Sequence, residues 1–154
     1  MFQKSPVSQN KIKKQLALIE KNITAELVKN PDSKELTSKY AAILLAQNKI
    51  TEAIPAYQAA IMANPSNAKL FAGLSVAYLH KANYKMAKAM ADEALKLKPE
   101  MKQAAKINAY IDQKEKVLAL AKQAKMADTA IKPQDAMHGV KSTVEAKKKI
   151  DDKK

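Results

Sequence analysis

Few residues in this chain are of the types that perform catalysis, and their spacing does not gather them into a site. The two histidines, His80 and His138, lie far apart, and neither has a metal-binding companion nearby. Asp92 and Glu93 form a lone acidic pair on a lysine-rich segment, which is typical of a solvated helix face. The sequence contains no cysteine, so a thiol nucleophile, a thiolate metal site and a disulfide are excluded.

The short motifs of nucleotide-binding and hydrolytic enzymes are also missing. The chain has only two glycines, no phosphate-binding glycine loop, no zinc-protease motif and no nucleophile elbow. We therefore expect a non-enzymatic protein with no cofactor and no metal. Scarce glycine beside abundant alanine, leucine and lysine gives high helix propensity almost throughout, which predicts an all-α fold.

The charge of the chain narrows the classes of partner. The formal net charge is +13, and all 28 basic residues are lysines. Because lysine lacks the planar fork that reads bases, sequence-specific nucleic-acid binding is disfavoured, whereas attraction to anionic surfaces stays open. The longest apolar run, residues 40–46, is far shorter than the ~20 residues of a transmembrane helix, so no membrane span is expected. The compartment stays open, since an exported protein without its leader would look the same.

Four prolines reveal an internal period in the sequence. Pro31, Pro65, Pro99 and Pro133 are separated by 34 residues each (65−31, 99−65 and 133−99). A fixed period of this length indicates a repeat architecture. Within residues 68–101, large apolar residues follow helical spacing and small alanines follow on the next helix, which predicts a closely packed helical hairpin.

Residues 68–101 resemble the tetratricopeptide repeat family. The resemblance is carried by positions 4, 7, 8, 11, 20, 24, 27 and 32 of the unit, which hold Phe71, Leu74, Ser75, Tyr78, Ala87, Ala91, Ala94 and Pro99. Residues 34–67 match at all but the first of these positions, with Thr37, Tyr40, Ala41, Leu44, Ala53, Tyr57, Ala60 and Pro65. The resemblance implies a short α-solenoid. Residues 47–49 and 80–83 are the predicted turns inside the two units, and Pro55 is expected to be tolerated near the start of its helix.

The flanking segments depart from the repeat pattern. We expect residues 1–9 to be a flexible lead-in, residues 10–133 a helical repeat domain, and residues 134–154 a polar, lysine-rich tail with a short helix. The repeat domain should open with a capping helix that follows Ser8 and ends before Pro31. The third unit is degenerate. It forms either a degenerate helical hairpin with its turn at residues 114–116 or one long helix, and the retained Pro133 favours the hairpin. Val117, Leu120, Ala121, Ala124 and Ile131 form an apolar stripe that predicts packing against another element.

The family resemblance also implies a concave groove lined by the first helix of each unit. It places eight candidate partner-binding residues there: Leu45, Lys69, Ala72, Val76, Leu79, His80, Lys106 and Tyr110. An apolar floor with a lysine rim suits an amphipathic protein segment with acidic edges. The carboxylate clamp by which some members hold the acidic ends of heat-shock chaperones is absent, because its positions carry Ser38, Ala42, Gly73, Gln103 and Ile107.

Other functions of the same surface stay open at this level. The groove is covered either by a partner, by a terminal helix of the chain itself, or by a second copy in a homo-oligomer. Alternatively, the lysine-rich surface binds an anionic polymer or a membrane face non-specifically, or the repeats self-assemble by stacking. The favoured hypothesis is a scaffold, adaptor or chaperone-like protein that binds a partner segment in the groove.

Overall fold

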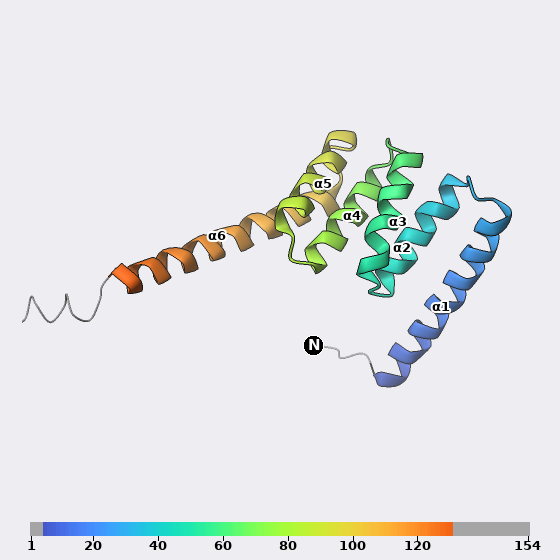
Figure 1. Cartoon of the computed structure of the whole chain (residues 1–154), viewed down its shortest axis with the longest axis horizontal. Coiled ribbons are helices and arrows are strands. Elements are labelled where there is room, and N and C mark those ends of the chain that lie inside the picture. Colours follow the sequence, from blue (N-terminus) through green and yellow to red (C-terminus); the bar gives the residue numbers. More distant parts are fainter. Residues whose placement is uncertain (1–4, 131–154) are drawn as a thin grey trace, which may run out of the picture. The chain divides into compact units, whose positions relative to one another are not determined.

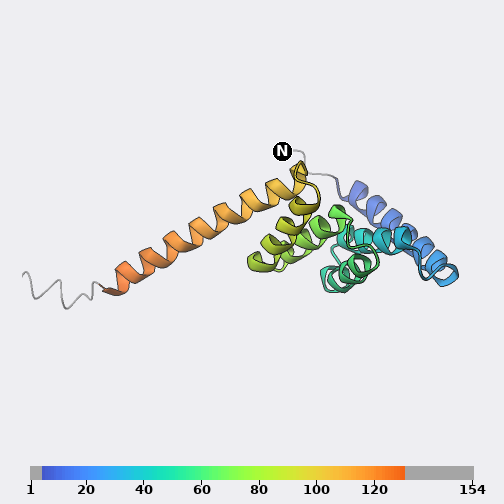
Figure 2. The same cartoon turned by 90° about the horizontal axis from the view of Figure 1, so that it is seen from above.

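The computed structural model describes residues 5–130, and every regular element in this range is an α-helix (Figure 1). The elements are α1 (Pro6–Lys29), α2 (Lys34–Ala46), α3 (Ile50–Ala63), α4 (Ala68–His80), α5 (Tyr84–Leu97) and α6 (Lys102–Ala130). The chain divides into two compact units, Met1–Ile111 and Asp112–Lys154. In the first unit, α2 with α3 and α4 with α5 form two stacked hairpins (Figure 2). The prediction of an all-α helical repeat is confirmed.

The two hairpins close with the same turn. After α2, Asn48 takes a left-handed conformation with φ 61°, and the backbone N–H of Lys49 donates to the carbonyl of Leu44 at 2.9 Å. After α4, Ala82 has φ 54°, and the N–H of Asn83 donates to the carbonyl of Tyr78 at 3.0 Å. These bonds satisfy carbonyls that the helix end leaves free. The turns thus lie where the sequence predicts them.

Small side chains allow the two helices of each hairpin to approach closely. In α5, Ala87, Ala91 and Ala94 are completely buried, and in α3 the corresponding Ala53 and Ala60 are buried too. The hydroxyl of Ser75 in α4 donates to the carbonyl of Ala87 in α5 at 2.5 Å. A buried hydroxyl needs such a partner, and here the bond joins α4 to α5.

A tyrosine and a glycine determine how the first hairpin packs on the second. The ring of Tyr57 in α3 is only 4% exposed. A Cβ atom at Gly73 in α4 would lie 2.4 Å from Cζ and 2.5 Å from the hydroxyl oxygen of this ring. Only glycine leaves room for the ring, so Gly73 has a packing role that outweighs its low helix propensity.

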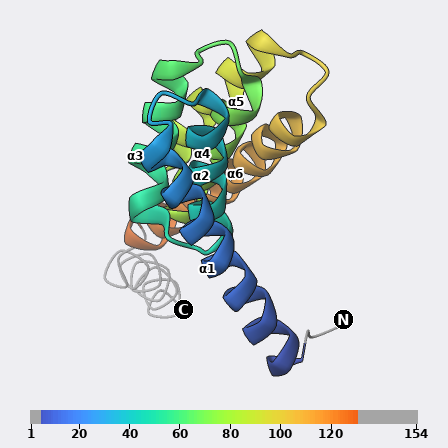
Figure 3. The same cartoon turned by 90° about the vertical axis from the view of Figure 1, so that its right-hand side faces the viewer.

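Helix α1 packs along α2, and its first turns extend past the end of α2 (Figure 3). It begins at Pro6, so the predicted lead-in of residues 1–9 is too long. Proline is favoured in the first turn because it needs no hydrogen-bond acceptor there. Ser8, the predicted cap, instead donates its hydroxyl to the carbonyl of Ser5 at 2.8 Å. The helix ends at Lys29, before Pro31, as predicted.

A polar cluster fixes α1 to the turn after α2. Glu20 accepts hydrogen bonds from Nζ of Lys49 and Nε2 of Gln47, both at 2.8 Å, and Gln47 also donates to the carbonyl of Leu16 at 3.2 Å. The hydrogen bond from Lys49, followed by that from Gln47, lowers the pKa of the Glu20 carboxyl. The same hydrogen bond raises the pKa of Lys49. Together with the buried Ile23, this cluster anchors α1 to the rest of the unit.

The third unit is one continuous helix, α6, so the favoured hairpin with a turn at residues 114–116 is wrong. The two real turns each contain an asparagine, Asn48 at the left-handed position and Asn83 as the cap that accepts from the N–H of Met86 at 3.2 Å. In the third unit, Lys116 stands at the position of Asn48 and Val117 at the position of Asn83. Lysine favours continuation of the helix, and valine has no side-chain oxygen with which to cap a new one. The expectations for Ile131, Pro133, His138 and the tail at 134–154 concern residues outside the described range.

Candidate functional site: a hollow between α4 and α6

A hollow of about 460 Å³ lies within the first unit, where the end of α4 meets the beginning of α6. Three residues of α4 and four of α6 line it: Val76, Leu79, His80, Gln103, Lys106, Ile107 and Tyr110. Five of these seven are among the eight candidate residues predicted from the sequence. Whether a partner binds there stays a prediction.

Helical spacing brings these side chains together. Val76, Leu79 and His80 are spaced at i, i+3 and i+4, so they share one face of α4, and the residues of α6 follow the same rule. The first part of α6 is held in place by Ile107 and Ile111, which are packed in the core of the hairpins. Nδ2 of Asn108 also donates to Oδ1 of Asp92 in α5 at 2.7 Å. The wall that α6 contributes is therefore firmly positioned.

The lining of the hollow has an apolar floor and a polar edge. Val76 and Leu79 are partly buried, Ile107 is almost fully buried, and the ring of Tyr110 is 46% exposed at the surface. His80 and Lys106 are exposed at the edge, with Gln103 as a hydrogen-bonding group. Apolar surface with a few polar groups at its margin is typical of a binding site for a protein segment.

Apolar, amide, amine, imidazole and phenol side chains line the hollow, and no carboxylate, serine or threonine is among them. Among the described residues, no three His, Cys, Asp or Glu side chains are grouped so that they could hold a metal ion. Within the same range, no helix is both long enough and apolar enough to cross a membrane.

Three of the predicted groove residues lie elsewhere. Ala72 is completely buried and packs with Ala68, Ala94, Met101 and Ala104, so its small side chain serves the contact among α4, α5 and the start of α6. Leu45 is partly buried against the main core. Lys69 is exposed beside the turns between the helical hairpins, in a different hollow with Lys98 and Glu100.

The sequence interpretation missed Ile107 as a lining residue. It named Ile107 only as a position where the chaperone clamp is absent. A signal was available, because Ile107 is three residues before Tyr110, which the family resemblance places in the groove, and so shares a helix face with it.

The comparisons with known proteins agree with this architecture. Residues 44–109 match the family described as tetratricopeptide repeat. No curated protein matches the sequence. Among solved structures, the Arabidopsis OM64 TPR domain is similar with a TM-score of 0.63 and 22% identity, over 65% of this chain and 83% of that one.

Two further structures share the fold. The first TPR of Spaghetti (RPAP3), bound to the HSP90 peptide SRMEEVD, has a TM-score of 0.63 and 19% identity, over 74% of this chain and 86% of that one. YrrB, described as a TPR protein with an unusual peptide-binding site, has a TM-score of 0.57 and 23% identity, over 60% of this chain and 47% of that one. Most repeat residues are buried as the pattern predicts, and residues 44–109 match the family model, so this part of the chain consists of tetratricopeptide repeats.

Proposed function

We propose that this chain is a non-enzymatic interaction module that holds a segment of a partner protein in the hollow between α4 and α6. The observation that carries the proposal is the convergence of Val76 and Leu79 from one helix with Lys106 and Tyr110 from another around one hollow. Similar domains of known structure bind peptides, which supports an interaction role.

The lining of the hollow specifies the chemistry of the partner. Its floor suits one or two apolar side chains, which gain free energy by leaving water. Lys106 at its edge, in a chain with net charge +13, favours carboxylates next to those side chains. The partner segment is therefore amphipathic, with an apolar anchor and acidic flanks.

The residues at two clamp positions argue against the carboxylate clamp of chaperone-binding repeats. At one clamp position Ile107 is almost fully buried, and at another Gly73 packs against the ring of Tyr57. Neither position offers a hydrogen-bond donor for a terminal carboxylate. The partner is consequently recognised mainly through its apolar anchor.

Site-specific photo-crosslinking in native cells tests the proposal. A photoreactive amino acid replaces Tyr110, which lines the hollow, or Met62, which is 86% exposed and does not. We expect a discrete adduct with another protein from position 110 and not from position 62. The additional substitution Leu79→Lys should remove the adduct, since it places a charge on the apolar floor.

Two results would refute the proposal. One is the same set of adducts from positions 110 and 62, which would mean that the hollow captures nothing selectively. The other is an adduct at position 110 with a terminal segment of the same chain or with a second copy, which would show that the protein itself covers the hollow.

A further inference from the structure

The second half of α6 carries apolar side chains that nothing in the described structure covers. Every residue from Asp112 to Thr129 is exposed. Val117 is 56% exposed and Leu120 is 65% exposed. Because most helical stability in proteins comes from packing of an apolar face, a helix of this length with such a face indicates a missing partner.

Four of the exposed apolar residues share one face of α6, whereas the exposed Leu118 and Met126 lie on other faces. Val117, Ala121 and Ala124 follow one another at steps of four and three residues, and Leu120 lies on the same face. Ala87, Ala91 and Ala94 of α5 have the same steps, and all three are completely buried against α4. A surface of this kind accepts the large apolar side chains of a second helix at close range.

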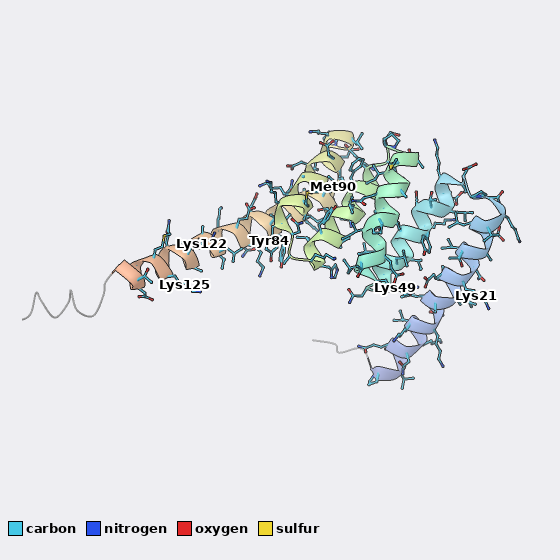
Figure 4. The ribbon with its side chains drawn as sticks, in the orientation of Figure 1. Lys21, Lys49, Tyr84, Met90, Lys122 and Lys125 are labelled. Carbon is cyan, nitrogen blue, oxygen red and sulfur yellow. The ribbon has the colours of Figure 1, made fainter. Side chains whose placement is uncertain are left out.

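Positive charge borders the stripe. Residues 112–128 contain four lysines and three acidic residues, Asp112, Glu115 and Asp128, and Asp128 lies one turn after Ala124 at the end of the stripe. At 3.6 residues per turn, Lys116 lies on one side of the stripe and Lys125 on the other, whereas Glu115 lies on the opposite face of the helix. Figure 4 labels Lys122 and Lys125 on this part of α6. The borders of the stripe therefore attract a negatively charged partner.

We propose that the stripe Val117, Leu120, Ala121 and Ala124 docks an acidic amphipathic helix of a partner protein. This helix presents bulky apolar side chains to the alanines, and its carboxylates lie beside Lys116 and Lys125. A second copy of α6 fits less well, because it would bring two sets of lysines together. A membrane surface also fits less well, since residues 112–130 have no aromatic side chain and the stripe is half alanine. The proposal is independent of the hollow between α4 and α6.

The test uses the full chain and a fluorescent synthetic peptide of leucine, alanine and glutamate, with leucines on one helical face and glutamates beside them. We expect saturable binding by fluorescence anisotropy that the double variant Val117→Lys and Leu120→Lys weakens at least tenfold. The matched control Met126→Lys adds a lysine to the opposite face, where Met126 is 72% exposed, and should bind like the unchanged chain. A peptide with lysine in place of glutamate should bind at least tenfold more weakly.

Other outcomes would overturn the proposal. Equal binding by the double variant and the unchanged chain would remove the stripe from the interaction, as would a Kd above about 1 mM for the acidic peptide. A homodimer in sedimentation analysis that the double variant dissociates would assign the stripe to a second copy. Binding to phosphatidylserine vesicles that only the double variant loses would assign it to a membrane.

Discussion

Replacement of Gly73 by alanine should destabilise the protein, although alanine is the better helix former. In an exposed helix this change gains about 0.5–1 kcal/mol. Here the new Cβ would lie 2.4 to 2.5 Å from three atoms of the Tyr57 ring, about 1 Å inside normal contact. Because the ring is only 4% exposed and has little room to move, the overpacking costs about 1–3 kcal/mol. The net loss is about 1 kcal/mol.

A double-mutant cycle isolates this contact. In the background Tyr57→Leu the ring is gone, and Gly73→Ala should then stabilise the protein by about 0.5–1 kcal/mol through helix propensity alone. The measurement is the free energy of unfolding in urea, followed by far-UV circular dichroism, for the unchanged chain, both single variants and the double variant. The effect of Gly73→Ala on the free energy of unfolding should therefore change sign between the two backgrounds.

Two outcomes of the double-mutant cycle would contradict the proposed contact between Gly73 and Tyr57. If Gly73→Ala stabilises both backgrounds equally, the coupling is zero and the close approach of Tyr57 to α4 is refuted. If it destabilises both equally, the cost arises from some other neighbour of Gly73.

Three further predictions concern the turns, the anchor of α1 and the specificity of the hollow. Ala82→Gly should raise the free energy of unfolding by about 0.5–1 kcal/mol, because Ala82 has a left-handed φ of 54°, and no gain in urea titration would contradict this. Glu20→Gln should cost less than about 1 kcal/mol at neutral pH. The folded state lowers the pKa of Glu20 below its usual 4.5, so the contribution of Glu20 to stability is present above that pH and is lost on further acidification. The free energy of unfolding of the variant should therefore fall less steeply at acid pH than that of the unchanged chain. An equally steep fall would argue against the contact. The HSP90 peptide SRMEEVD should show no saturable binding in calorimetry, and tight binding would mean that carboxylate recognition arises without the clamp residues.

The two complete repeats could be predicted because their determinants are local. A close contact between two helices requires small residues such as Ala91, and the turn residue Asn48 adopts a left-handed backbone at low cost. The periodic prolines then indicate where each repeat ends. The sequence is therefore sufficient to predict the elements, their order and the hairpin contacts of residues 34–101.

The remaining differences depend on neighbours that a repeat frame does not specify. The period continues to Pro133, yet a turn needs residues that stop one helix and cap the next, and Lys116 and Val117 do neither. Ala72 occupies a groove position in the frame, but the start of α6 packs over it. Ile107 shares a helix face with Tyr110, which was a signal for its place in the hollow, but the contacts of Ile111 and Asn108 that anchor α6 are tertiary and do not follow from helical spacing.

The most direct test of the account measures the affinity of the hollow for the segment recovered by crosslinking at position 110. Isothermal titration calorimetry would compare the unchanged chain with Leu79→Lys on the floor of the hollow and with Met62→Lys, whose side chain is exposed away from it. We expect at least a tenfold loss of affinity for Leu79→Lys, unchanged affinity for Met62→Lys and equal helicity of all three proteins. Equal affinity of Leu79→Lys and the unchanged chain would contradict binding in the hollow.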